Sequence, residues 1–189
     1  TNTDRVNVEN RSANFLGNAY VELTPLEGLS FKTSLSTSVF NDREGDFRGL
    51  YSKDRIFRQP RAWLTNNFNT SYTLDNILNY KVKAGIHQLN VTAAQSALKE
   101  RFEQSGSSVQ DLPYNSGWYA FQTAATITGL NSSLRERSIL SYMGRINYNI
   151  NDKYLLTVTG RYDGSSVLAA GNKWAFFPSV ALAWRAGDE

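Results

Sequence analysis

The chain has 189 residues, with 20 Lys and Arg against 17 Asp and Glu, and a formal net charge of +3. This length suits one ordinary domain, and the charge is too small to indicate a nucleic-acid-binding protein. The sequence has no Cys and a single His, His87, which excludes a disulfide framework, a cysteine metal cluster and a multi-histidine site. The longest apolar run, Val180 to Trp184, is far shorter than the ~20 residues of a membrane-spanning helix.

Aromatic residues make up 13% of the chain, small polar residues are abundant, and the mean hydropathy is −0.43. This composition favours β-strands with one wet face. Alternation of apolar and polar residues, which is the period of a strand, predicts four strands in the N-terminal half. They cover about residues 19–23, 29–39, 68–81 and 89–94. The second of them carries a row of serines and Lys32 on its polar side, which suits a hydrated lumen better than a packed core.

Three more strands are predicted in the C-terminal half, where the alternation is clearest. They cover about residues 138–150, 154–163 and 174–185. An Asn-Asp pair at 151–152 predicts a tight turn, so the first two of these strands form a hairpin. The polar side of the hairpin carries Arg145, Arg161 and Asp163. Together with Lys32, these charges are expected to face a water-filled lumen, which they hydrate and brace.

The connections between the predicted strands alternate in length. The short ones lie at 25–28, 83–87 and 151–152, and the long ones at about 42–67 and 100–137. Short turns at one rim and long loops at the other are typical of outer-membrane barrels. We therefore predict an all-β fold in which about seven antiparallel, up-and-down strands of residues 1–189 form part of a transmembrane β-barrel. The loops at 42–67 and 100–137 are expected to be extracellular.

Aromatic side chains lie near both ends of the apolar side of the C-terminal strands. They are Tyr142, Tyr148, Tyr154, Tyr162, Trp174, Phe176 and Trp184. Membrane barrels carry a belt of aromatic residues at each membrane interface, so these residues are predicted to form the two membrane girdles. His87 falls in a predicted short turn and is expected to be exposed.

Four C-terminal stretches resemble the SusC/RagA-type TonB-linked outer-membrane transporters. They are LSYMGRINY at 140–148, DKYLLT at 152–157, RYDGSS at 161–166 and NKWAFFPSVALAWR at 172–185. The resemblance is specific over about 138–186 and rests on strand and turn order alone over about 15–100. It departs from the family at 167–171, where the family more often has an aromatic-Gly pair.

The resemblance implies a barrel of about 22 strands, of which this chain holds a middle portion without the plug domain. Seven strands cannot close a barrel of that size, and the polar residues 1–5 do not read as a signal peptide, so a mature, internal fragment is expected. The family imports oligosaccharides or peptides through the outer membrane of Bacteroidetes-type bacteria. The implied partners are the rest of the transporter chain, a SusD-like surface lipoprotein, TonB through the absent N-terminal region, and outer-membrane lipid.

Two other classes of protein fit the same strands. A soluble or cell-surface β-sandwich would bind carbohydrate through its aromatic residues, and it would bury the face carrying Leu140, Tyr142 and Val180 against a second sheet. A barrel wall would leave that face bare. A passive porin shares the barrel and lacks the plug, so residues outside this chain distinguish it from the transporter.

Candidate binding residues lie in the predicted loop 100–137. Trp118, Tyr119 and Phe121 form an apolar cluster there, which would either stack on a sugar or a lid protein or pack the loop against the barrel interior. The alternating acidic residues of 42–46 lack the glycine spacing and the bidentate Glu of an EF-hand, so no metal site is expected. The sequence contains no identifiable nucleophile with a partnered base and no phosphate-binding loop. We therefore expect no catalysis, no cofactor and no nucleic-acid partner.

Overall fold

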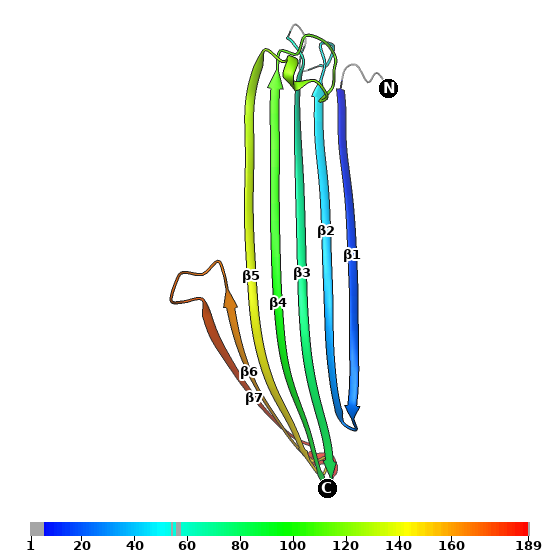
Figure 1. The fold of residues 1–189 in the computed structure, drawn as a ribbon, viewed down its shortest axis with the longest axis vertical. Helices are drawn as coiled ribbons and strands as arrows, with labels where there is room; N and C mark the ends of the chain where they lie inside the picture. The colour runs from blue at the N-terminus through cyan, green and yellow to red at the C-terminus, as the bar shows by residue number, and fades with distance from the viewer. Residues whose placement is uncertain (1–5, 54, 56–57, 189) are drawn as a thin grey trace. The chain divides into compact units, whose positions relative to one another are not determined.

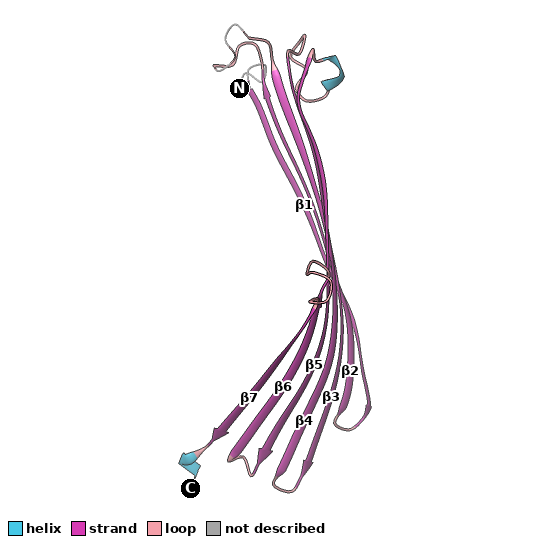
Figure 2. Ribbon diagram, turned by 90° about the vertical axis from the view of Figure 1, so that its left-hand side faces the viewer, coloured by secondary structure: helices cyan, strands magenta, loops and turns pink. Residues whose placement is uncertain are grey.

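The computed structural model describes residues 6–53, 55 and 58–188, and seven strands make up most of them. The strands are β1 (Val6–Leu26), β2 (Leu29–Arg48), β3 (Arg61–Ala84), β4 (His87–Gln110), β5 (Thr126–Ile150), β6 (Tyr154–Ser165) and β7 (Trp174–Trp184). Two short 3-10 helices, η1 (Phe121–Thr123) and η2 (Ala186–Asp188), are the helical elements of this part of the chain (Figure 2). Neither of these described helices has the length or the apolar character to cross a membrane.

The seven strands form one sheet, in which each strand pairs with its neighbour in the sequence (Figure 1). The predicted all-β, up-and-down fold is therefore confirmed. The β-sandwich alternative required a second sheet over the apolar face. The described residues form a single open sheet instead, so that alternative is wrong for this part of the chain.

The chain divides into two compact units, which are described separately below. The loop unit comprises Thr1–Leu16, Ser38–Thr70 and Arg101–Glu136. The turn unit comprises Gly17–Thr37, Ser71–Glu100 and Arg137–Glu189. The turn unit contains all of β6 and β7, whereas β1 to β5 each contribute residues to both units.

The three tight turns between successive strands lie in the turn unit. Gly28 and Gly85, with φ of 79° and 58°, supply the left-handed backbone that the first two turns require. The β5–β6 turn uses Asn151 and Asp152 with φ of 51° and 54°. Positive φ at both central residues is the geometry of the type I′ hairpin, whose twist matches that of the flanking strands. The predicted hairpin therefore forms at the expected residues.

The predicted long loops were wrong in extent. The structure shortens the segment predicted at 42–67 to a connection of residues 49–60, and the one at 100–137 to residues 111–125. Strands occupy the remainder of both segments. The alternation fades there because charged and polar residues occupy both sides of the strands, as they do from Lys99 to Arg101, so a search for period two finds no strand.

Candidate functional site

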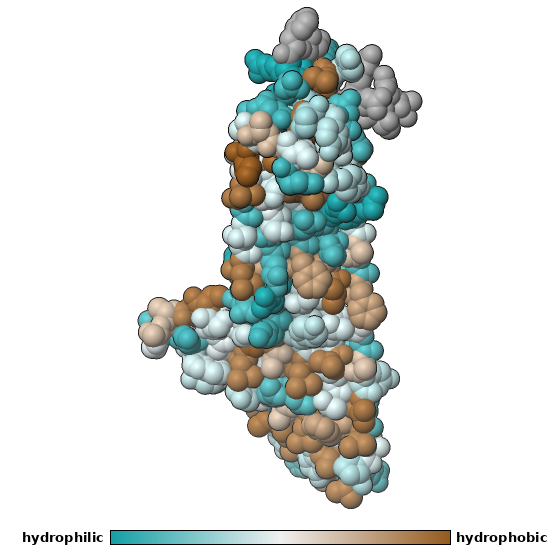
Figure 3. Space-filling view, turned by 45° about the horizontal axis from the view of Figure 1, so that its top comes forward, coloured by the Kyte–Doolittle hydropathy of each residue, from teal (hydrophilic) through white to brown (hydrophobic). Residues whose placement is uncertain are grey.

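One face of the sheet in the turn unit is apolar. Cross-strand partners point to the same face, so the observed register places the apolar positions of β5, β6 and β7 in shared rows. These rows are Tyr142–Tyr162–Phe176, Ile146–Val158–Val180 and Tyr148–Leu156–Leu182. Most of these side chains are exposed, and Leu182 exposes 80% of its surface. Brown, hydrophobic side chains gather over the turn unit in Figure 3. We call this surface the apolar face. Water-soluble monomeric proteins rarely expose a contiguous apolar surface of this kind.

The predicted girdle residues lie on the apolar face in two groups. The ring of Trp174 stacks on Tyr162 at 4.7 Å between ring centroids and lies 6.3 Å from the ring of Tyr142. In the second group, Tyr154 lies directly opposite Trp184. The structure therefore brings the predicted aromatic residues together near each end of the paired strands. Their role as membrane girdles stays a prediction.

Phe176 lies opposite Tyr162 in the first group, and Tyr148, the last of the predicted girdle residues, contacts the turn histidine. Tyr148 stacks on His87 with the two rings nearly parallel, and a hydrogen bond of 2.8 Å joins Tyr148 Oη to His87 Nδ1. His87 is exposed at the start of β4, as expected from its place beside a turn. The contact links β4 to β5 next to two tight turns of the sheet.

Gly164 makes room for the stack around Trp174. A Cβ added at Gly164 would lie 2.7 Å from the indole ring, whereas a Cβ added at Gly144 would have no heavy atom within 4 Å. We therefore expect Gly164→Ala to displace Trp174 and to lower stability by about 1–3 kcal/mol. Gly144→Ala is the matched control, because Gly144 lies on β5 and on the same face of the sheet as Gly164 on β6. The stability of this variant is expected to be close to that of the wild type.

The measurement for this pair is the unfolding midpoint of the full-length protein in detergent. Equal midpoints for the two variants would contradict the role of Gly164. A lower midpoint for Gly144→Ala than for Gly164→Ala would contradict it as well.

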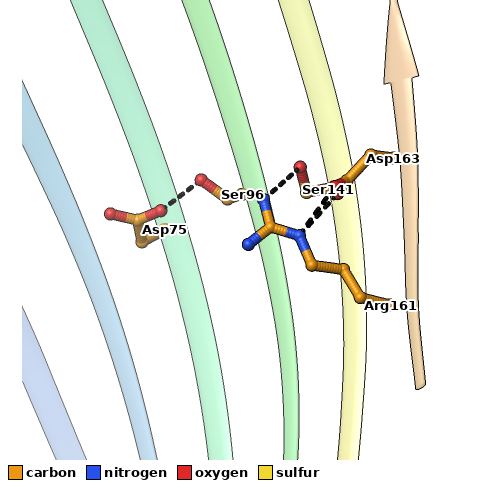
Figure 4. Close-up of polar contacts among 5 residues, drawn as sticks. All are labelled: Asp75, Ser96, Ser141, Arg161 and Asp163. Atoms are coloured by element: carbon orange, nitrogen blue, oxygen red, sulfur yellow. Dashed lines mark hydrogen bonds and ion pairs between the residues drawn. The ribbon is translucent and has the colours of Figure 1, made fainter. Parts of the chain in front are cut away.

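The opposite face of the turn unit carries polar side chains that are hydrogen-bonded to one another, as Figure 4 shows. Ser96 Oγ donates to Asp75 Oδ1 at 2.5 Å. Arg161 Nε lies 2.8 Å from both carboxylate oxygens of Asp163 and its Nη2 donates to Ser141 Oγ at 3.4 Å. Ser141 is buried beneath this group. This surface, the polar face, thus presents an acidic side chain at Asp75 and an ion pair at Asp163.

Further cross-strand hydrogen bonds extend the polar face. Arg145 Nε donates to Thr159 Oγ1 at 3.2 Å, and the two residues are directly opposite in the β5–β6 register. Thr157 Oγ1 donates to Asn147 Oδ1 at 2.9 Å in the next polar row. On β2, the Lys32 ammonium lies 4.3 Å from the centre of the Tyr20 ring. Arg145, Thr157 and Lys32 therefore each have a partner on a neighbouring strand of the sheet.

The structure brings together three of the four predicted lumen residues. Arg145, Arg161 and Asp163 share the polar face of β5 and β6, whereas Lys32 lies on β2 beside Tyr20. Sequence reasoning missed Asp75 as a site residue. The signal was present, because Asp75 occupies a polar position in the alternation of β3 and Ser96 a polar position in β4.

The loop unit has its own small hydrophobic core. The core consists of Phe47, Ala62, Val109, Leu112 and Trp118, with Leu64, Phe121 and Ala124 packed against it. Trp118 is only 4% exposed, and its ring lies 3.0 Å from where a Cβ at Gly45 would be. Tyr119 is exposed, and the Arg43 guanidinium lies 5.8 Å from the centre of its ring. Of the three predicted contact residues, Tyr119 is therefore the one whose ring is open to a ligand.

A line of hydrogen bonds joins four strands of the loop unit. Ser12 Oγ donates to Asp42 Oδ1 at 2.6 Å, and Asn67 Nδ2 lies 3.5 Å from Asp42 Oδ2. Gln104 Nε2 donates to Asn67 Oδ1 at 3.0 Å. Asp42 is buried in this line. Its carboxylate is thereby hydrogen-bonded to side chains of β1 and β3.

Charged groups of the loop unit pair with one another. Arg48 Nη2 lies 2.7 Å from Asp46 Oδ2. Arg101 forms ion pairs with Glu103 and, at 3.2 Å, with Glu136, and these carboxylates raise the pKa of the Arg101 guanidinium. Within residues 6–53, 55 and 58–188, no group of three or more His, Cys, Asp or Glu side chains could hold a metal ion.

This chain is similar to known receptors and transporters. No protein-family model matches the chain. It is 30% identical over 182 residues to TonB-dependent receptor P3 of Formosa agariphila. That alignment covers 96% of this chain and 18% of the receptor. It is 46% identical over 52 residues to TonB-dependent receptor SusC of Bacteroides thetaiotaomicron, covering 28% of this chain and 5% of that protein.

The fold matches solved structures of the same kind. The chain superposes on the RagAB peptide transporter with a TM-score of 0.84 at 19% identity, over 95% of this chain and 20% of that one. The chain thus spans about a fifth of the length of the relatives that it matches over most of its residues.

Proposed function

Because this chain is homologous to SusC-type TonB-dependent receptors, as its C-terminal strands predicted, we propose that it forms part of the wall of an import barrel in the bacterial outer membrane. The chain is a barrel portion of such a receptor and not an enzyme. In the proposed function, the apolar face contacts lipid acyl chains and the polar face lines the water-filled lumen.

The uncovered apolar face is the observation that carries this proposal. A transmembrane strand needs about 9–11 residues, and β6 and β7 have 12 and 11. Polar groups in lipid must be satisfied within the protein. The side chains of Asn76 on β3 and Gln95 on β4 share the apolar face. Asn76 Nδ2 donates to Gln95 Oε1 at 2.6 Å, which meets this requirement for one donor and one acceptor.

The cargo and the partners follow from the resemblance. We propose that the complete transporter imports oligosaccharides or peptides, and that a SusD-like lipoprotein covers it from outside. Energy would come from TonB, which contacts a region that is not part of this chain. The polar face supports this role because the hydroxyl, amide and charged groups around Asp75 and Arg161 suit a hydrated path for a polar cargo.

Tyr119 is our proposal for a contact with the cargo or the lid. It is an exposed aromatic ring beside a guanidinium, an arrangement that can stack on a sugar or a planar peptide group. Trp118 and Phe121 would act by holding the connection that carries Tyr119, since both pack in the core of the loop unit.

The proposed environment of the two faces can be tested at adjacent residues. A spin label at Val158 of the full-length receptor in lipid vesicles is expected to be accessible to oxygen, which dissolves in lipid. A label at Thr157 is expected to be accessible to a water-soluble nickel chelate, because successive side chains of a strand point to opposite faces. Water accessibility at both positions, or at neither, would refute the wall proposal.

A further inference from the structure

The apolar face of the turn unit contains a hollow. Its volume is about 480 Å³, and its apolar lining includes Tyr72, Leu74, Ala97, Leu140 and Trp174. The small side chain of Ala97 leaves room at the floor of the hollow, and the larger side chains of Tyr72 and Trp174 line it as well. Lipid acyl chains fill depressions of this kind, because a void would forfeit dispersion contacts along its lining.

The lining of the hollow also includes cationic and hydroxyl groups. Lys99 lies two residues beyond Ala97 on β4, so alternation places both side chains on the apolar face. Lys173, Ser138 and Ser166 line the hollow as well. In the part of the chain that the structure describes, neither lysine forms an ion pair, and Lys99 is exposed.

The hydroxyl of Ser166 is held by a backbone hydrogen bond. The backbone N–H of Ser138 donates to Ser166 Oγ at 2.8 Å. Because that oxygen accepts from the backbone, the hydroxyl proton of Ser166 remains available to donate to another group. The hollow therefore combines a long apolar floor with cations and a hydroxyl donor, which is complementary to an acyl lipid with an anionic phosphate.

We propose that this hollow binds lipopolysaccharide, with an acyl chain of its lipid A on the apolar floor and a lipid A phosphate at Lys99. The proposal rests on the proposed membrane orientation. In that orientation the tight turns at Gly85 and Asn151 mark the periplasmic rim. Lys99 lies twelve residues along β4 from its start at His87, and twelve steps of ~3.3 Å at a tilt of ~40° rise about 30 Å, the thickness of a hydrocarbon core, so the hollow faces the outer leaflet. The anionic phosphates of lipid A match the unpaired lysines, whereas a zwitterionic phospholipid presents a cation beside its phosphate.

The test uses the purified full-length receptor in detergent and measures retained lipid by native mass spectrometry. The probes are lipid A with its phosphates, dephosphorylated lipid A and phosphatidylglycerol. Lys99→Ala is expected to weaken lipid A binding about fivefold, the usual contribution of one lysine at an anionic membrane surface, and addition of Lys173→Ala is expected to weaken it further. Ala97→Phe fills the floor without changing charge and is also expected to weaken binding.

Lys83→Ala, near the short-turn end of β3, is the matched control and is expected to leave lipid A binding unchanged. The proposal is overturned if Lys99→Ala weakens binding no more than Lys83→Ala. Equal retention of dephosphorylated lipid A, or of phosphatidylglycerol, would overturn it as well. The spin-label experiment tests the wall proposal separately. If the label at Val158 is exposed to lipid but Lys99→Ala leaves lipid A binding unchanged, the lipid A site is refuted while the wall proposal stands.

Discussion

Val158→Arg is expected to destabilise the full-length receptor in lipid by about 2–4 kcal/mol, the effect of an arginine on the lipid side of a barrel near the bilayer midplane. Val158 lies halfway between Tyr154 and Tyr162 in β6 and is flanked by Ile146 and Val180 on the apolar face. The guanidinium would lie among acyl chains, at the greatest distance from both rows of aromatic residues.

Thr157→Arg is the matched control, because it adds the same side chain one residue away on the polar face. The substitution removes the hydrogen bond from Thr157 to Asn147, so a loss of about 1 kcal/mol is expected. Urea unfolding of the receptor in lipid vesicles measures both effects. If Thr157→Arg lowers the free energy of unfolding more than Val158→Arg does, the lipid side and the lumen side of the sheet have been assigned the wrong way round.

Trp118→Ala is expected to cost about 3–5 kcal/mol of local stability in the loop unit, the range for truncation of a large buried aromatic residue. Trp118 is 4% exposed and packs among Phe47, Val109 and Leu112. Its loss leaves a cavity beneath residues 111–125, so faster proteolysis and faster hydrogen exchange are expected in that connection.

Two companion variants separate packing from ligand contact. Trp118→Phe is expected to retain most of the stability, since within the described residues the indole Nε1 has no hydrogen-bond partner to lose. Tyr119→Ala removes an exposed ring and is expected to leave proteolysis unchanged while lowering uptake of cargo or binding of the lid. Unchanged uptake and lid binding by Tyr119→Ala would remove Tyr119 from the proposed contact site.

The sequence predicted the turn unit well because apolar and polar residues separate onto its two faces. Alternation of apolar and polar residues is clearest in the C-terminal part of β5 and in β6, and the structure pairs these strands at the predicted hairpin. The loop unit was predicted poorly because its strands carry polar and charged residues on both sides. From Asp42 to Asp46 on β2, for example, charged residues and a glycine leave no alternation, so this part of the strand was predicted as a loop.

The candidate site was predictable in part for a related reason. Arg145, Arg161 and Asp163 belong to the best-patterned strands, where a charge on the polar side is conspicuous. The partnership between Asp75 and Ser96 depends on the β3–β4 register, which single-strand patterns do not specify. The burial of Trp118 depends on the path of an irregular connection, which alternation does not describe.

The length of β7 also determines the thickness of the bilayer in which this wall would fit. Trp174 and Trp184 mark its two ends, and ten steps of ~3.3 Å at a tilt of ~40° span about 25 Å along the membrane normal. Bacterial outer membranes are thinner than average bilayers, which agrees with this span. In a thicker membrane the surrounding lipid would have to compress or the barrel would have to change its tilt, so hydrophobic mismatch would confine the protein to thin membranes.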